Sequence, residues 1–366
     1  MKACLRFAVP ALLALALAVP SPLDACAPAP PQNVVVEVAS ESAVIVWDAK
    51  AKTQHFIRRA TFTASAPGSV PVADFGFLVP TPSVPVLEEA DDKAFDELAK
   101  VTAPRTVTQS RPSDGGGGCI GGCGMMAEKS AGKAEATVEV LAAKRVGGYD
   151  AVVLKANDAD ALAEWLNKRG YEVRPALARW LKPYVNEKGW VVTAFKIAND
   201  PAATAGAGIG TTAVRMSFAA DAPFFPYREP DDMRDAKTPR LLRVFMIADQ
   251  KMSGSLGAGE AWEGKTVWVG KPGAEGWKGA VPHLKIPGFA PGEDEWLTEF
   301  EDHSSPRKGD TDLRFVSAAD QTPVRRPDRI VYTARADGGA APAFALLAGV
   351  ALCLYLTRFL TALARK

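Results

Sequence analysis

Residues 53–63 alternate between two kinds of side chain. The two alternate sets are Phe56, Ala60 and Phe62, which are apolar, and Arg59, Thr61 and Thr63, which are polar. Successive side chains of a β-strand point to opposite faces of the sheet, so this period of two predicts a strand with one buried and one exposed face. Half-buried strands are typical of antiparallel sheets. This pattern sets the expected fold class.

Further runs rich in β-branched and aromatic residues predict more strands. They cover residues 33–39, 43–47, part of 74–85, 137–143, 149–155, 171–173, 189–197, 212–218 and 240–248. Helical spacing of apolar residues predicts helices over 88–100, 159–169 and 175–184, the second beginning after Asp158 and closing at Gly170, the third ending at Pro183. We therefore expect an α+β fold, mainly antiparallel sheet with a few packed helices, plus one C-terminal transmembrane helix.

The N-terminus resembles an export signal. Lys2 and Arg6 precede the apolar residues 11–19, and small residues follow up to Ala25. A charged front, a short apolar core and a small-residue exit are typical of a secretory signal peptide. Leu-Asp-Ala-Cys also has the outline of a lipoprotein box with Cys26 as the lipidated residue. We favour ordinary cleavage near Ala25, because Asp24 stands where such a box prefers a small or apolar residue.

The C-terminal segment is predicted to be a membrane anchor. Residues 340–357 carry no charge, and apolar character resumes at Phe359 before the chain ends in Arg365-Lys366. Eighteen uncharged, mostly apolar residues fit the lower range for a spanning helix. The basic end favours a cytoplasmic tail. Gly338-Gly339 before this span also resembles a tail that a sorting protease removes, and a plain linker is the favoured alternative.

A cleaved signal and one late span predict that residues 26–339 lie outside the cytoplasm, anchored to the cell membrane. Of the 43 basic and 42 acidic residues of the chain, five basic residues and Asp24 lie outside this segment, which leaves it a net charge of about −3. Binding to nucleic acid requires clustered cations, so nucleic acid is not expected as a partner. The membrane is the expected partner, together with an envelope protein or a surface ligand.

Two cysteines lie in a glycine-rich stretch, Gly-Gly-Gly-Gly-Cys119-Ile-Gly-Gly-Cys123-Gly. Residues 102–133 bury too little to offset the entropy of ordering them, so we expect a flexible surface loop. Because an exported protein meets an oxidising compartment, a disulfide is favoured. Cys119–Cys123 is the preferred pairing, and a bridge from either residue to Cys26 stays open.

The sequence predicts no catalytic, cofactor-binding or metal-binding residue. His55, His283 and His303 are far apart, and the two loop cysteines have no second pair with which to hold zinc. Glu301-Asp302-His303-Ser304-Ser305 contains the residue types of a catalytic triad, but triads are assembled in space, and a polar loop is the favoured interpretation. The glycines at 206–210 precede a strand, which excludes a dinucleotide loop.

Four segments together resemble a bacterial exported family, domain of unknown function family 2330. They are DFGFLVPTPSVP at 74–85, GGYDAVVLKANDADALAEWLNKRGYEV at 147–173, GWVVTAFKI at 189–197 and FAADAPFFPYR at 218–228. The resemblance spans roughly residues 26 to 300. It implies the architecture and the exported location, and it implies no reaction.

The expected organisation has five parts. These are a signal peptide (1–25), an N-terminal β-rich part (26–101), a Gly/Cys-rich loop (102–133), an α+β part (134–335) and the transmembrane anchor (340–364). The expected function is that of an uncharacterised envelope or surface protein that binds a partner or has a structural role. A non-enzymatic role is favoured over an enzymatic one. The alternative is an exported hydrolase whose site is assembled in space.

Overall fold

The computed structural model of the chain describes residues 27–29, 35–65, 76–110, 137–197, 208–210, 212–234, 240–304 and 307–333. The expected signal peptide, the cysteines Cys26, Cys119 and Cys123, and the expected membrane anchor lie outside these residues. Among the described residues, no helix is both long enough and apolar enough to cross a membrane.

The described residues fall into two compact units. The smaller unit pairs β6 (Thr106–Ser110) with β18 (Arg329–Thr333) as parallel strands. The larger unit holds the remaining elements and is built on two sheets. The smaller of these sheets has the order β1-β4-β9-β8-β7 and is antiparallel throughout. Its strands are β1 (Ala27–Ala29), β4 (Gly76–Thr81), β9 (Val191–Ile197), β8 (Tyr149–Ala156) and β7 (Val138–Val146).

The larger sheet has the order β15-β16-β13-β2-β3-β11-β5, with β10 also pairing with β3. Its strands are β15 (Lys265–Gly270), β16 (Trp296–Asp302), β13 (Leu241–Ala248), β2 (Val35–Asp48), β3 (Thr53–Ser65), β11 (Val214–Ala219), β5 (Val86–Glu89) and β10 (Gly208–Gly210). Among the described strands of this sheet, only β13 and β2 run parallel. A third, short sheet consists of β12 (Phe224–Phe225), β17 (Leu313–Ser317) and β14 (Met252–Ser255).

The two main sheets face each other and enclose one apolar layer, which we call the inter-sheet layer. It contains side chains from both sheets, such as Ile45 and Phe56 from the larger sheet and Phe77 and Phe195 from the smaller. Phe77 and Phe195 stack with ring centroids 4.8 Å apart, and Tyr149 meets both rings edge-on. Burial of large aromatic side chains from both sheets joins them into one core.

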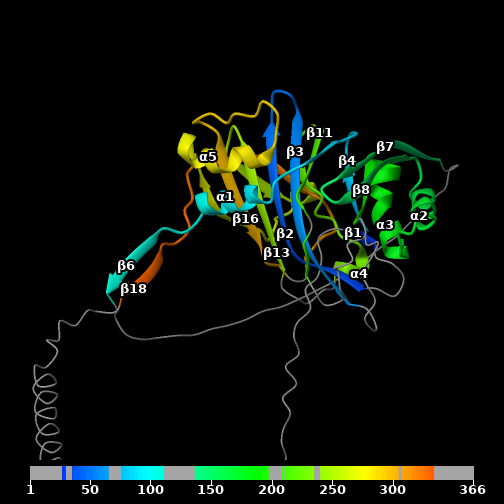
Figure 1. The fold of residues 1–366 in the computed structure, drawn as a ribbon, viewed down its shortest axis with the longest axis horizontal. Helices are drawn as coiled ribbons and strands as arrows, with labels where there is room; N and C mark the ends of the chain where they lie inside the picture. Colours follow the sequence, from blue (N-terminus) through cyan, green and yellow to red (C-terminus); the bar gives the residue numbers. More distant parts are fainter. Residues whose placement is uncertain are drawn as a thin grey trace, which may run out of the picture. The chain divides into compact units, whose positions relative to one another are not determined.

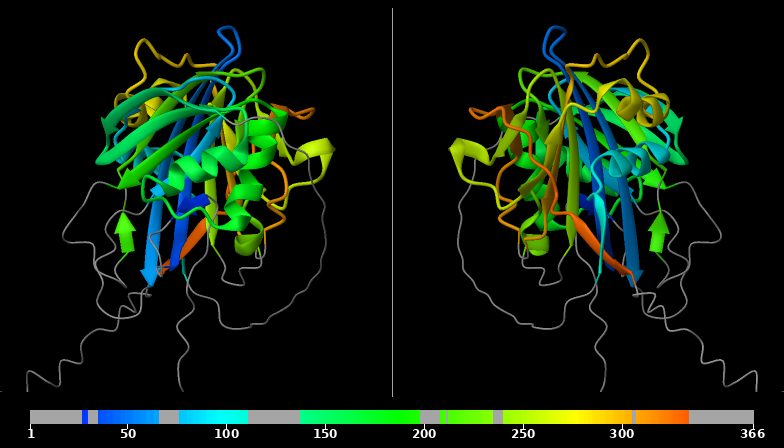
Figure 2. Two further views of the ribbon diagram at one scale, coloured as in Figure 1. Left: turned by 90° about the vertical axis from the view of Figure 1, so that its right-hand side faces the viewer. Right: turned by 90° about the vertical axis from the view of Figure 1, so that its left-hand side faces the viewer.

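Helices cover the outer face of each sheet, as Figures 1 and 2 show. The helices over the smaller sheet are α2 (Ala159–Asn167) and α3 (Pro175–Lys182), and those over the larger sheet are α1 (Lys93–Val101) and α5 (Gly273–Leu284). Each pair buries its own apolar cluster against the sheet beneath. The short elements α4 (Asp231–Arg234), η1 (Pro183–Glu187, a π-helical turn) and η2 (Gly257–Gly259) complete the chain. The fold is α+β with mostly antiparallel sheets.

The helix at 159–169 is confirmed in type and at its start. The side chain of Asp158 accepts a hydrogen bond from the backbone N–H of Ala161, which satisfies one of the free donors at the helix start. Gly170 has φ +81°, a left-handed conformation that favours glycine after a helix. The strand expected at 171–173 is wrong. This segment belongs to the irregular connection between α2 and α3, and the ring of Tyr171 is buried in the cluster under those helices.

Three further expectations need correction. The helix expected from residue 88 begins at Lys93, because Glu88 and Glu89 belong to β5 and pair with β11. Pro183 does not end the helical path, because one π-helical turn follows α3. The strand at 53–63 is present, but none of its residues 53–59 is exposed. Ile57 is buried beneath the helices that cover the outer face of the larger sheet.

Candidate functional site

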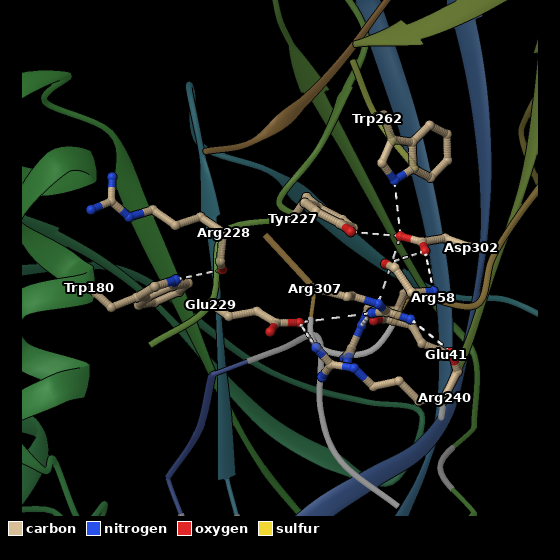
Figure 3. Close-up of polar contacts among 11 residues, drawn as sticks. Glu41, Arg58, Trp180, Tyr227, Arg228, Glu229, Arg240, Trp262, Asp302 and Arg307 are labelled. Carbon is tan, nitrogen blue, oxygen red and sulfur yellow. Dashed lines mark hydrogen bonds and ion pairs between the residues drawn. The ribbon is translucent and has the colours of Figure 1, made fainter. Parts of the chain in front are cut away.

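Six charged side chains are buried together at one end of the inter-sheet layer (Figure 3). This buried charge cluster consists of Glu41, Arg58, Glu229, Arg240, Asp302 and Arg307. Charged groups are almost never fully buried unless they are paired. The positions of these six side chains are therefore tightly constrained by their need for partners.

Strands of the larger sheet supply Glu41, Arg58 and Asp302, and Arg240 immediately precedes β13 of the same sheet. Strand register places Leu242, two residues after Arg240, opposite both Asp302 of β16 and Glu41 of β2. Arg58 of β3 lies opposite Ala43, two residues further along β2. Because opposite and alternate residues of a sheet share a face, Glu41, Arg58 and Asp302 lie on the face that also carries the inter-sheet apolar residues.

The other two residues come from segments without regular structure. Glu229 lies in the stretch after β12, and its backbone N–H donates to the carbonyl oxygen of Gly309 at 2.7 Å. Gly309 has φ +47°, and a Cβ at this position would lie 3.3 Å from the side chain of Glu229. The close approach therefore favours glycine, and it fixes Glu229 beside the segment that carries Arg307.

Each of the six charges takes part in at least one ion pair. Arg58 Nε lies 2.6 Å from Glu41 Oε1. Arg240 Nη2 pairs with Glu229 Oε1, and Arg307 Nη1 lies 3.9 Å from the same oxygen. Arg307 Nε lies 3.8 Å from Asp302 Oδ2, so Arg307 stands between two acids. Three acids face three arginines, and the cluster carries no net formal charge.

Asp302 receives most of its hydrogen bonds from neutral donors. Tyr227 donates its hydroxyl to Oδ2 at 2.6 Å, Trp262 donates its indole N–H to the same oxygen at 3.0 Å, and the backbone N–H of Ser304 donates to Oδ1 at 2.8 Å. Burial opposes ionisation, but the charge of Arg307 and the bonds from Ser304 and Tyr227 outweigh it and lower the pKa of Asp302. The same surroundings raise the pKa of the Tyr227 hydroxyl, chiefly through burial and the charge of Asp302. Asp302 is therefore held as a carboxylate.

Burial acts strongly on the carboxyl group of Glu229. Loss of solvent raises the pKa of its carboxyl to about 7, although Arg240 and Arg307 both act to lower it. Its Oε2 atom is buried without a hydrogen-bond partner among the described residues. Glu229 thus depends on its two arginines to keep a charge in the core.

A small pocket adjoins the cluster between the two sheets. Its volume is about 10 Å³, roughly the space that one water molecule needs. It is lined by Arg58, Phe77, Val79, Tyr149, Phe195, Thr212, Val214 and Met216. The guanidinium of Arg58 lies 4.8 Å from the centroid of Phe77, a cation–π contact at the pocket wall. Arg58 therefore joins the charge cluster to the aromatic part of the inter-sheet layer.

A second group of charges lies on the outer face of β16. Arg326 Nη2 lies 2.9 Å from Glu299 Oε1 and 2.7 Å from Glu301 Oε1, and Arg243 contacts the same two acids. Burial raises the pKa of Glu299. Burial also acts to raise that of Glu301, but hydrogen bonds from Arg326 and Arg243 lower it to about 2. Both faces of β16 therefore carry paired charges.

The three histidines lie apart from the pocket. His283 Nδ1 lies 2.8 Å from Asp91 Oδ2, which ties the end of α5 to the residues before α1. His303 Nε2 lies 3.5 Å from Glu301 Oε2 at an exposed position. His55 contacts Ser217, and burial lowers its pKa. Each of His283 and His303 meets one carboxylate, and neither lines the inter-sheet pocket.

The structure describes only some of the residues that the sequence singled out as site candidates. The disulfide candidates Cys26, Cys119 and Cys123 lie outside the described residues. The polar-loop interpretation of residues 301–305 holds for His303 and Ser304. Glu301 and Asp302 belong to β16, where Asp302 is buried, and Ser305 lies outside the described residues. Within the described ranges, no three His, Cys, Asp or Glu side chains come together as metal ligands would.

Sequence reasoning missed the charge cluster. Ser40-Glu41-Ser42 reads as a polar break between two apolar runs, yet β2 runs through it with a bulge between Val38 and Ser40. Arg58 shares the alternate set of Phe56, which was the one available signal that this arginine is buried. The partners lie too far along the chain for spacing to reveal them.

The ion pair between Arg240 and Glu229 can be tested by removing one or both charges. We expect Arg240→Met to lower the free energy of unfolding by about 3–5 kcal/mol, because it leaves Glu229 buried without its main partner. The double variant Arg240→Met/Glu229→Leu should recover most of that loss, because it removes both charges. Chemical denaturation measures the difference.

The control for this test is Lys168→Met, which breaks the exposed pair between Lys168 and Glu164 and should leave the stability close to that of the wild type. A double variant as unstable as the single one would contradict the pairing, because the loss would then not come from an uncompensated charge.

Comparison with known proteins identifies the family. The family described as "Uncharacterized protein conserved in bacteria (DUF2330)" matches residues 24–315, which is most of the chain and includes every member of the buried charge cluster. No curated protein and no solved structure gives a match. The chain belongs to the DUF2330 family of uncharacterized bacterial proteins.

Proposed function

We propose that this chain is an exported envelope or surface protein, held at the membrane by residues 340–364, that acts as a binding module by accepting an extended segment at the edge of β7. The export signal at 1–25 and the uncharged run at 340–357 support the location. In this proposal a disulfide closes the glycine-rich loop through Cys119 and Cys123, with Cys26 as the alternative partner.

The observation that carries the binding role is the exposure of β7. Among the residues that the structure describes, this strand is the last in its sheet and pairs with β8 alone. All residues from Glu139 to Arg145 are exposed, including Val140 at 48% and Leu141 at 37%. An edge strand offers a row of backbone donors and acceptors to another chain, and exposed apolar side chains beside that row add affinity and specificity.

The inter-sheet pocket supports binding less well than this edge does. Its volume of about 10 Å³ matches a single water molecule, whereas small-molecule sites typically enclose several hundred Å³. The neighbouring charges are engaged with one another and contribute to the core. The edge of β7 is therefore the better candidate surface.

A photo-reactive amino acid in place of Val140 tests the binding role in intact cells. We expect irradiation to join this position to another polypeptide segment, because an added strand would lie within reach of the edge. The matched control replaces Val316, which is of the same type and 52% exposed but lies on β17. Equal crosslinking at both positions, or none at Val140, would refute the proposed function.

The location is tested separately by cell fractionation and mass spectrometry. Removing residues 340–366 should release the chain from the membrane fraction, because the spanning segment is lost. The mature N-terminus should begin near Cys26. If the truncated chain leaves the membrane fraction only when Cys26→Ala is also present, a lipid on Cys26 holds the chain instead. A mature chain that retains Lys2 would disprove export.

A further inference from the structure

The open part of the β7 edge is confined to its first half. At its other end, Lys144 Nζ donates to the carbonyl oxygen of Leu87 at 2.7 Å and lies 3.2 Å from Glu88 Oε1. The backbone N–H of Gly147 donates to Glu89 Oε1 at 3.1 Å. These contacts hold the end of β7 against β5. The residues before Lys144 lie beyond these contacts.

The sequence of this open stretch favours pairing with another strand. Residues 139–143 read Glu-Val-Leu-Ala-Ala, followed by Lys144. Native edge strands are often protected by charged side chains, especially lysine, or by proline, and residues 140–143 contain none of these. An acid stands before the apolar centre and a base stands after it. Antiparallel pairing of two such strands brings the acid of each copy to the base of the other.

The β-bulge in β7 determines which side chains share a face. In the pairing with β8, Glu139 lies opposite Lys155 and Lys144 lies opposite Ala151. Lys155 and Ala151 are four residues apart in β8 and so share one face. Glu139 and Lys144 therefore share that face too, although a spacing of five in a regular strand would separate them. The register shift between Val140 and Ala142 supplies the extra residue.

The same reasoning applies to the residues inside this pair. Val140 lies opposite Leu154 and Ala143 lies opposite Val152, so these two share the other face. The β8 partners within each pair are an even number of residues apart. The backbone N–H and C=O groups of residues 139 and 144 therefore point the same way, and so do those of residues 140 and 143. Two copies of β7 can thus oppose each other, residue 139 against 144 and residue 140 against 143, with faces and backbone directions matched.

We propose that β7 pairs antiparallel with β7 of a second copy of this chain, about a two-fold axis between Leu141 and Ala142. Glu139 of each copy then faces Lys144 of the other, which makes two symmetric charge pairs around an apolar centre. The side chain of Lys144 is 47% exposed, so it can reach a second acid while it stays near Glu88. This inference rests on the proposed function, since it names the segment that the edge accepts.

A charge-reversal experiment on the full chain, purified in mild detergent with a thiol reductant, tests this register. We expect the wild type to sediment as a dimer. Glu139→Lys and Lys144→Glu should each weaken self-association by about tenfold or more, because each places like charges opposite each other twice. Mixing the two variants should restore a dimer, because the cations of one then face the anions of the other.

Two further variants keep the test decisive if a charge reversal disturbs folding. Leu141→Asp places two carboxylates beside the two-fold axis and should also give a monomer, whereas Val316→Asp should remain a dimer. Circular dichroism checks that each variant is folded. A mixture that stays monomeric, or single variants that associate as the wild type does, would overturn the proposed pairing. A monomer that still crosslinks from position 140 to a different protein would overturn it too, while the proposed function would stand.

Discussion

The balance of charge at one end of the inter-sheet layer is the constraint on which this fold depends. Three carboxylates and three guanidinium groups are removed from water there, and each is costly to bury alone. The members come from β2, β3, the residue just before β13, the end of β16 and two irregular segments. Correct pairing therefore requires that the larger sheet and the segments carrying Glu229 and Arg307 are all in their native positions. Misplacement of any one of them would leave a buried charge without a partner.

This arrangement separates the stabilising part of the molecule from the part proposed to bind. The charge cluster and the aromatic stack lie inside the sandwich, where the pocket has room for about one water molecule. The open edge belongs to β7, the last strand in the order of the smaller sheet. A sandwich with helices on both outer faces has few free sheet edges, and β7 is one that keeps apolar side chains exposed. Association through this edge would leave the buried charges undisturbed.

Most strands and the α2 helix were predictable because their signals are local. Alternation marks β3, and Asp158 and Gly170 mark the ends of α2. The charge cluster was not predictable, because the burial of each acid depends on partners that are distant in the sequence. Glu41 is buried with Arg58, and Asp302 with Tyr227 and Trp262. Likewise, α5 was missed because Gly273–Leu284 contains Pro282 and three glycines, and its burial against the larger sheet outweighs that weak helix propensity.

Hydrogen–deuterium exchange of the wild-type chain tests the central role of the charge cluster most directly. If the cluster holds the sandwich together, the backbone amides around Glu41, Arg58 and Asp302 exchange only through global unfolding, at the same slow rate as those around Ile45, Phe56 and Phe300 in the centre of the layer. Fast exchange at the charged end, with the centre still protected, would contradict this role of the cluster, because the sheets would then be held by apolar packing alone.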